Sequence, residues 1–367
     1  MRIFAVNPGS TSTKIALFED DTPLFSANVS HDAEMLNTFP EISDQFEYRK
    51  DTILREVDKA GYTLQGVSAF VGRGGGLVSL VGGTYAVNDI LLSHARLGFT
   101  VKHPAMLGAQ LAHAFAVEYG GEAFVVNPPD VDELIPEARV TGWRGVYRES
   151  RIHALNQKEI GIRFAKAQGK RYEDLNLIIC HIGGGTSITA HCKGRMIDSN
   201  DIANGDGPMA PTRCGTLPVK DVITACFHSG LTEQELRSRV NKNGGLVDHL
   251  GTSDIRAARQ MEAEGGDYAR LIINAMTYQI GKFIGSMACA MAGKVDAVIC
   301  TGGVSHDREL TTNLERMCGW IAPFTVMAGE FEMEALAAGA LRVLRGEEKA
   351  KNYTGVPIWN GFPCEPA

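Results

Sequence analysis

A strand–turn–strand pattern occurs twice in this chain and constrains its fold more than any other feature. In each copy, a short buried strand enters a turn rich in Gly, Ser or Thr, and two further strands follow. The strands are predicted at 3–6, 15–18 and 24–25 in the first copy and at 177–180, 188–192 and 196–197 in the second. Such a repeat indicates an internal duplication of one β-meander.

Helical and strand patterns alternate between the two copies. Leu107, Leu111 and Phe115 recur at fourfold spacing, which predicts a helix, and the apolar run 123–126 predicts a buried strand. The Pro- and acid-rich stretch 127–145 has no clear period and reads as a long surface excursion. The chain is therefore an α/β protein, and we expect a domain boundary close to residue 150.

The second half repeats the alternation. Residues 271–292 are apolar but are interrupted by Gln279 and Lys282, so they predict a buried helix and not a membrane span. A buried strand is predicted at 297–300 and an amphipathic helix at 332–344. The sequence predicts two domains, 1–150 and 151–367.

Composition narrows the class of protein. The net charge of −7 does not favour a general nucleic-acid or anionic-membrane binder, because such proteins need basic faces. The eight cysteines include no Cys-x-x-Cys pair, which is typical of neither a disulfide scaffold nor a zinc module. The N-terminus lacks the form of a signal peptide. We expect a cytoplasmic protein that binds neither nucleic acid nor membrane.

The two glycine- and hydroxyl-rich turns have a chemistry of their own. Their backbone N–H groups and hydroxyls can surround phosphate oxygens, one turn from each half, which predicts a cleft between the halves. The chain has no Gly-x-x-x-x-Gly-Lys-[Ser/Thr] motif, and residues 183–185 do not open a Gly-x-Gly-x-x-Gly helix turn. Either turn alone is also compatible with an ordinary hairpin.

Five short motifs resemble those of the butyrate kinases, which group with the acetate kinases in the superfamily of acetate and sugar kinases, heat-shock chaperones and actin. They run through nearly the whole chain. The motifs are Asn-Pro-Gly-Ser-Thr-Ser-Thr-Lys at 7–14, Gly-Arg-Gly-Gly at 72–75, His-Ala-Leu-Asn-Gln-Lys at 153–158, His-Ile-Gly-Gly-Gly at 181–185 and Gly-Glu-Phe-Glu-Met-Glu-Ala-Leu at 329–336.

The resemblance implies a fold and a reaction. The fold is a pair of duplicated ribonuclease H-like (actin-like ATPase) domains around a central nucleotide cleft, with acid-binding elements in the first domain and nucleotide-binding elements in the second. The reaction is the reversible, direct in-line phosphorylation of butyrate or a similar short-chain acid by ATP with Mg²⁺, which yields ADP and an acyl phosphate. The resemblance also favours a homo-oligomer, a dimer or larger.

Phosphoryl transfer to a carboxylate needs cations and donors, because the acceptor is already ionised and needs no general base. Arg73 and Arg213, both in Gly-rich surroundings, are the catalytic candidates, since a guanidinium binds carboxylate and phosphate through two parallel bonds. The family implies that His181 stabilises the transferring phosphoryl group. From the residues alone, surface ion pairs and a structural histidine are the competing interpretations, and the pair His181 and His191 lacks the companions that a zinc site requires.

The resemblance assigns further roles. It implies that one group of residues faces the phosphoryl group and the acid, that a group of glycines lets the nucleotide approach the backbone, and that Glu332 holds Mg²⁺, with Glu330 as a competitor. The first group is Asn7, Ser10, Ser12, Lys14 and His103, and the glycines are Gly183, Gly184, Gly185, Gly302 and Gly303. A solvent-facing position of the Lys14 side chain is the lesser alternative.

Three departures from the acetate kinases are visible. Asn127 stands where they have an Asp, so a neighbouring Asp or Glu332 with water ligands would have to serve the metal. Gln157 replaces a histidine and Gly184 replaces an Asn, which points to the butyrate branch. Kinases for branched-chain or other short-chain acids, a nucleotide-gated binding ATPase and a sugar kinase are the alternatives. A sugar kinase would need an Asp base for the acceptor hydroxyl.

Overall fold

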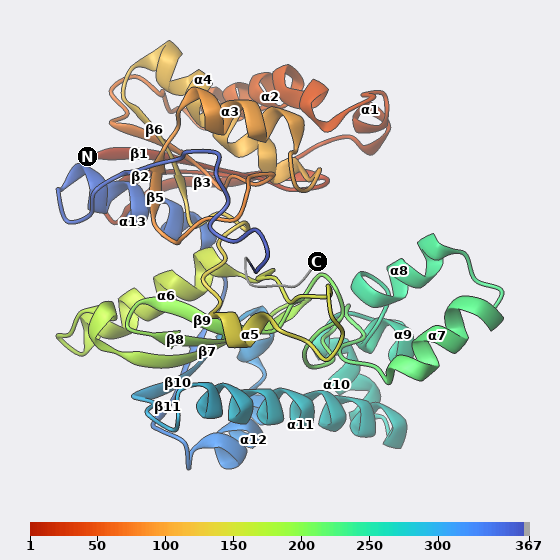
Figure 1. Ribbon diagram of the computed structural model, residues 1–367. Coiled ribbons are helices and arrows are strands. Elements are labelled where there is room, and N and C mark those ends of the chain that lie inside the picture. The colour runs from red at the N-terminus through yellow and green to blue at the C-terminus, as the bar shows by residue number, and fades with distance from the viewer. Residues whose placement is uncertain (363–367) are drawn as a thin grey trace. The chain divides into compact units, whose positions relative to one another are not determined.

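The computed structural model describes residues 1–362 and divides the chain into two compact units (Figure 1). Unit 1 comprises Met1–Asp132 and the segment that begins at Phe331, and unit 2 comprises Glu133–Glu330. Unit 1 is therefore built from two separate stretches of chain.

Each unit contains one mixed β-sheet. The order of strands is β12-β5-β6-β4-β1-β2-β3 in unit 1 and β11-β10-β7-β8-β9 in unit 2. The strands of unit 1 are β1 Arg2–Pro8, β2 Ser12–Glu19, β3 Thr22–Ser30, β4 Ala69–Gly72, β5 Thr84–Ala86, β6 Glu122–Val126 and β12 Lys351–Asn352. Those of unit 2 are β7 Asn176–Ile182, β8 Thr186–Cys192, β9 Arg195–Ser199, β10 Ala297–Gly302 and β11 Phe324–Ala328.

The two sheets share one topology. In unit 1, β1 pairs antiparallel with β2 and parallel with β4, and β4 pairs parallel with β6. In unit 2, β7 pairs antiparallel with β8 and parallel with β10, and β10 pairs parallel with β11. The correspondence confirms the internal duplication that the repeated pattern predicts.

Both units also contain helices. Those of unit 1 are α1 Ala33–Asn37, α2 Phe46–Lys59, α3 Asp89–Leu97, α4 Leu107–Tyr119 and α13 Glu332–Leu344. Those of unit 2 are α5 Pro136–Arg139, α6 Ala154–Ala167, α7 Val219–His228, α8 Glu233–Asn241, α9 Leu246–Leu250, α10 Ile255–Ala263, α11 Asp267–Ala290 and α12 Arg308–Cys318. Short 3₁₀ turns lie at η1 Ile42–Gln45, η2 Pro104–Met106, η3 Tyr172–Asp174 and η4 Gly303–His306.

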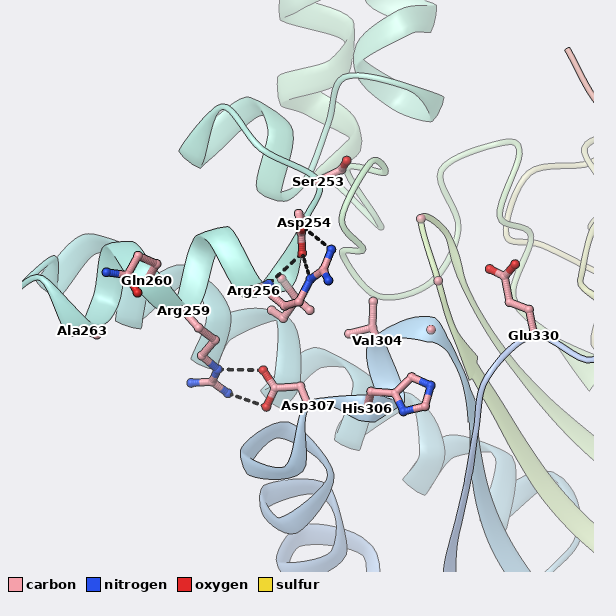
Figure 2. Close-up of a pocket in the computed structure, with 14 residues that line it drawn as sticks. Ser253, Asp254, Arg256, Arg259, Gln260, Ala263, Val304, His306, Asp307 and Glu330 are labelled. Carbon is pink, nitrogen blue, oxygen red and sulfur yellow. Dashed lines mark hydrogen bonds and ion pairs between the residues drawn. The ribbon is translucent and has the colours of Figure 1, made fainter. Parts of the chain in front are cut away.

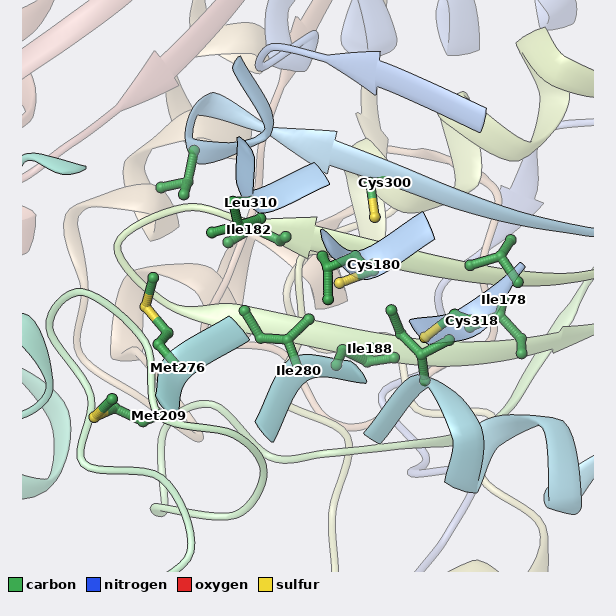
Figure 3. Packing of buried hydrophobic residues seen from close by; sticks show 14 of the residues in the cluster. Ile178, Cys180, Ile182, Ile188, Met209, Met276, Ile280, Cys300, Leu310 and Cys318 are labelled. Carbon is green, nitrogen blue, oxygen red and sulfur yellow. The ribbon is translucent and has the colours of Figure 1, made fainter. Parts of the chain in front are cut away.

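The hydrophobic cores form between the sheets and these helices. In unit 1, the rings of Phe4, Phe70 and Phe115 pack together with centroids 5.8–6.2 Å apart. In unit 2, Ile178, Cys180 and Ile182 of β7 lie in one buried cluster with Met276 and Ile280 of α11 (Figure 3). The buried face of α11 confirms the prediction of a core helix at 271–292, and no helix among residues 1–362 is long and apolar enough to cross a membrane.

After the last parallel strand of each meander, the chain passes into the other unit, where a helix packs against the sheet of that unit. After β6 the chain leaves unit 1, and α6 packs against β7. After β11 the chain leaves unit 2, and α13 packs against β1, β4 and β6. The units accordingly divide at 132/133 and again at 330/331, whereas the sequence alone suggested one boundary near 150.

The stretch 127–145 differs from its expected character as a surface excursion. Val131 and Leu134 are buried, as are the polar side chains of Asn127, Asp130 and Asp132. Buried polar groups need partners, and the backbone supplies some of them: Asp130 Oδ1 accepts from the Leu77 N–H at 3.2 Å. The acidic composition therefore reflects internal hydrogen bonding over the first part of this stretch.

Candidate active site

The first glycine- and hydroxyl-rich turn lies between β1 and β2 in unit 1, and a buried arginine stabilises it through hydrogen bonds. The Arg49 side chain, on α2, is fully buried and donates to the carbonyls of Gly9 at 3.0 Å and Ser10 at 3.2 Å and to the Thr13 hydroxyl at 3.1 Å. Gln45 Oε1 accepts two further bonds from the same guanidinium. Every one of these acceptors is neutral, and burial lowers the pKa of Arg49 to about 10.

The predicted phosphate-side residues occupy different parts of this turn. Ser10 is exposed at its tip and Ser12 is half-buried at the start of β2. Asn7 is buried at the end of β1, and Lys14 is its partner across the antiparallel ladder. The turn therefore brings a buried amide, two hydroxyl residues and a lysine position to one end of the sheet.

Arg73 follows β4, and a close helix approach fixes its position. A Cβ at Gly72 would lie 2.1 Å from the carbonyl oxygen of Gly108 on α4, so only glycine permits this contact. Arg73 Nη1 lies 2.5 Å from Glu332 Oε1, and Asn7 Nδ2 donates to Glu332 Oε2 at 2.7 Å. Unit 1 thus brings together Asn7, Arg73 and Glu332.

His103 lies at the start of η2, where its Nδ1 accepts from the Ala105 N–H at 3.1 Å. Although the residue is exposed by surface area, surrounding protein atoms lower the pKa of its ring, and the charges of Arg73 and Arg49 lower it further. A neutral ring at neutral pH accepts through Nδ1 and can donate through Nε2.

Asn127, after β6, acts on the backbone. Its φ of +38° is in the left-handed region, its N–H donates to Gly83 O at 3.0 Å, and its Oδ1 accepts from the Gly83 N–H at 2.7 Å. Asn127 therefore joins the end of β6 to the segment just before the antiparallel strand β5.

His181 lies inside β7, whereas the sequence predicted a strand that ends at residue 180 and a turn that begins with this histidine. Its side chain is buried, and Nδ1 lies 2.8 Å from Asn156 Oδ1 on α6. A Cβ at Gly183 would lie 3.1 Å from His181 Nε2, so the glycine keeps that nitrogen uncrowded. The ring of His153 stacks on that of His181 with centroids 3.9 Å apart.

The glycine turn 183–185 is tied to the loop that carries Arg213. Gly184 O accepts from both the N–H and the hydroxyl of Thr212, at 2.9 and 2.8 Å. Arg213 Nε donates to Ile202 O at 3.1 Å and Nη1 bonds the Thr212 hydroxyl at 2.5 Å. These hydrogen-bond acceptors are neutral, and burial lowers the pKa of Arg213. Unit 2 thus combines His181, a glycine turn and a guanidinium without a carboxylate partner in the described chain.

A cavity of about 780 Å³ opens beside this turn, inside unit 2 (Figure 2). Gly183, Gly184 and Gly303 line it together with Glu330, whereas Gly185 and Gly302 do not line it. Two ion pairs brace the wall: Arg256 binds Asp254 through two bonds of 2.7 and 3.0 Å, and Arg259 binds Asp307 through bonds of 2.8 and 3.2 Å. The volume is that of a site for a small molecule or cofactor.

Gly302 has a different function. Its φ is +89°, and a Cβ there would lie 2.4 Å from Ile182 O of the neighbouring strand β7. It exchanges two backbone hydrogen bonds of 3.1 Å with Gly329. The glycine therefore joins the ends of β10 and β11 and leaves Gly303 at the cavity.

Two sheets of the same meander topology define the class of the fold: duplicated actin-like domains. A structure of acetate kinase from Porphyromonas gingivalis supports that fold, with a TM-score of 0.75 and 19% identity over 94% of this chain and 99% of the other.

The sequence comparisons are more specific. Residues 144–321 match the family described as the acetokinase family. Butyrate kinase 1 of Clostridium acetobutylicum is 42% identical over 352 residues, which cover 96% of this chain and 99% of the relative. A probable butyrate kinase of Clostridium botulinum is 43% identical over the same shares of the two chains. The chain therefore belongs to the acetokinase family and is a kinase.

Several residues of this region were not singled out from the sequence. Arg49 carried no signal beyond its residue type, since its contacts join elements distant in sequence. His153 stood at the start of one of the five motifs but received no role of its own. The pair Asp254 and Arg256 does have a local signal, because Asp254 accepts from the Arg256 N–H at 2.9 Å as the N-cap of α10. The remaining cavity residues become neighbours only through the fold.

Proposed function

We propose that this protein catalyses the reversible phosphorylation of butyrate or a similar short-chain fatty acid by ATP, giving the acyl phosphate and ADP. The observation that carries the proposal is the full-length similarity to butyrate kinases, at 42% and 43% identity over 96% of this chain. Arg73, which in this structure binds the Glu332 carboxylate at 2.5 Å, supplies the guanidinium that an acid substrate requires.

The proposed roles follow from charge. The acid is ionised at neutral pH, so the attacking oxygen needs no base, and catalysis consists of positioning and neutralising anions. Arg73 and His103 are proposed to bind the acid, and the first turn, with Asn7, Ser10, Ser12 and Lys14, the phosphoryl group. Arg213 and His181 are proposed to stabilise the charge of the transferring phosphoryl group. The cavity beside Gly183, Gly184 and Gly303 is proposed to hold the nucleotide, with Gly185 and Gly302 supporting it.

Magnesium fits the residues through a single carboxylate. Residues 1–362 contain no cluster of three or more His, Cys, Asp or Glu side chains suited to a metal, but Mg²⁺ bound to nucleotide commonly keeps water ligands and takes one or two carboxylates. Glu332 would hold the ion, and Glu330, at the cavity, is the competitor. When bound, the metal would neutralise phosphate charge. Asn127 Oδ1 is already engaged by the Gly83 N–H.

A kinase for branched-chain or other short-chain acids is the alternative. Assembly into a homo-oligomer and a cytoplasmic location stay predictions.

The test is a trapping assay with purified protein, Mg-ATP, hydroxylamine and a panel of acids from acetate to hexanoate, including isobutyrate. Acyl hydroxamate from acids of three to five carbons is the expected result and identifies the preferred acid. If ATP binds but no acid gives hydroxamate, the proposal is wrong, and a kinase for another acceptor takes its place.

A further inference from the structure

In unit 2, a series of four buried polar side chains is linked to His153 by successive hydrogen bonds. The series comprises Tyr172, His191, Gln157 and Ser187, of which Tyr172 is 5% exposed and the other three are fully buried. Successive contacts are 2.5 Å from Tyr172 OH to His191 Nδ1, 3.0 Å from His191 Nε2 to Gln157 Oε1, 2.7 Å from Gln157 Nε2 to Ser187 Oγ and 2.9 Å from Ser187 Oγ to His153 Nδ1. Four buried groups in series need a reason for their cost.

Gln157, in the middle of this series, fixes the direction of its hydrogen bonds. Gln157 Nε2 also lies 3.0 Å from the Ser187 carbonyl oxygen, which can only accept. The Gln157 amide nitrogen therefore faces Ser187, and its oxygen accepts from His191. His191 must carry its proton on Nε2, which leaves Nδ1 as an acceptor.

His191 and Tyr172, at the end of the series distant from His153, agree with this direction. Burial, followed by the charge of Lys158, holds the pKa of His191 well below its usual range, so the ring is neutral and has one N–H. Burial, followed by the charge of Glu133, raises the pKa of Tyr172 well above its usual value, so its hydroxyl keeps its proton. Tyr172 therefore donates to His191 Nδ1.

The near end is fixed by elimination. Ser187 Oγ accepts from Gln157, and in the described part of the chain the other polar atom bonded to that oxygen is His153 Nδ1. If His153 donated from Nδ1, the buried serine hydroxyl would have no acceptor, which is costly. Ser187 therefore donates, and His153 accepts at Nδ1.

We propose that Tyr172, His191, Gln157 and Ser187 form a positioning relay that holds His153 as its Nε2–H tautomer, with its ring stacked on His181. The catalytic consequence rests on the proposed function, in which His181 meets the phosphoryl group. Two imidazolium rings with centroids 3.9 Å apart would repel each other, so a neutral His153 permits His181 to carry the positive charge. The four relay residues do not line the cavity.

The direct test is the ¹⁵N spectrum of histidine-labelled wild-type protein at neutral pH, with the His153 signals assigned by their loss in His153→Gln. The relay predicts a protonated Nε2 and an unprotonated Nδ1 for both His153 and His191. An Nδ1–H form of His153 in the folded wild-type protein would overturn the proposal. This measurement needs no catalysis, so it stands apart from failure of the proposed function.

A substitution then tests the consequence. In Gln157→Glu, the carboxylate cannot donate to Ser187 and instead accepts a hydrogen bond from the Ser187 hydroxyl. His153 Nδ1 then loses its donor, so both tautomers of His153 become populated. We expect kcat to fall by about 10- to 100-fold, with ADP affinity within about twofold of wild type. The matched control is Gln168→Glu, exposed at the end of the same helix α6.

Removal of the far donor gives a graded effect. Tyr172→Phe leaves His191 Nδ1 without a donor but keeps the ring, and a fall in kcat smaller than that of Gln157→Glu is expected, together with a partial shift of the His153 tautomer. The control is Tyr268→Phe, because Tyr268 contacts His249 Nδ1 at 2.7 Å in an exposed pair. Loss of activity in a folded variant with an unchanged His153 tautomer would contradict the relay.

Discussion

The same turn of the duplicated meander is supported in opposite ways in the two units. In unit 1, the turn between β1 and β2 rests on Arg49, a buried cation that binds two carbonyls of the turn. In unit 2, the turn between β7 and β8 consists of glycines whose support is neutral: Gly183 N–H to Gly185 O at 3.0 Å, and Thr212 to Gly184 O. There the cation, Arg213, lies beside the turn on the loop of Thr212.

The comparison shows that duplication preserved the backbone path while the source of positive charge changed. A guanidinium whose bonded acceptors are all neutral keeps its charge uncompensated by a nearby acid, and both units have one: Arg49 is fully buried and Arg213 is half-buried. In unit 1 the charge stabilises the turn itself, because its bonds are used on carbonyl groups. In unit 2 few of the bonds are used, so the charge is available to a ligand.

The sharpest way to break this comparison is Arg213→Ala. Turnover should fall by about a thousandfold or more, because the role proposed for Arg213 is to stabilise the charge of the transferring phosphoryl group. ADP affinity, measured by calorimetry, should remain. Arg237→Ala, on the exposed face of α8, is the control. Weaker ADP binding with normal turnover would show that Arg213 serves the nucleotide and not the transfer.

Arg49→Met tests whether the cation of unit 1 is structural. The variant leaves the Gly9 and Ser10 carbonyls and the Thr13 hydroxyl without their donor, and stability should fall by about 3 kcal/mol or more. Thr212→Val in unit 2 removes one side-chain hydrogen bond and should cost about 1 kcal/mol. Amide exchange of β1–β2 and of β7–β8 measures the two locally. Equal losses would mean that the two turns are not differently supported.

The acid stability of unit 1 should depend on His31. This buried ring contacts the Thr13 hydroxyl at 2.8 Å, and burial, followed by the charge of Arg49, lowers its pKa to about 4. The unfolded chain binds the proton from about pH 6.5 downward, so stability is lost as the pH falls from about 6.5 to 4. The loss should be about 2 kcal/mol once solvent screening is considered.

Denaturant titrations at several pH values measure this dependence. His31→Gln, which keeps a polar partner for Thr13, should flatten the curve between pH 6.5 and 4. The exposed His228→Gln should not change it. An unchanged slope in His31→Gln would assign the pH dependence to other groups.

The smallest effect is expected from a substitution at Asn127, which tests a comparison between the ends of the corresponding strands β6 and β11. Gly329 follows β11 with a φ of +117°, and Asn127 follows β6 with a φ of +38°. Asp tolerates this conformation and still offers an oxygen to the Gly83 N–H, but its charge would be buried, so Asn127→Asp should lower stability by about 1 kcal/mol. Activity in the trapping assay should stand or rise. An inactive, well-folded variant would show that the amide itself is required.

The sequence was sufficient for the elements whose signal is local. Buried strands such as 177–180 and 297–300 are continuous apolar runs, and the helix at 332–344 has a regular period. It was insufficient for the division of the chain, because the period of that helix reveals its apolar face but not the sheet that the face covers. The repeated meander suggested one boundary where the fold has two.

The candidate site follows the same rule. Arg73 and Arg213 stand out beside glycines in the sequence, whereas Arg49 lies within the helix pattern of α2, where an arginine normally indicates a solvent-facing position. Its role depends on a turn forty residues away, with Gly9 as the acceptor. His153 depends likewise on α6 lying against β7, which brings its ring to His181.

The placement of α13 has a consequence for the order in which the protein is made. This helix covers β1, β4 and β6 of unit 1, yet it is encoded after all of unit 2. During synthesis, the face of this sheet that α13 covers stays exposed until residue 344 has left the ribosome, although the first strand begins at residue 2. Unit 2, whose segments are continuous from Glu133 to Glu330, is complete by then. The half of the molecule translated first is thus the half finished last.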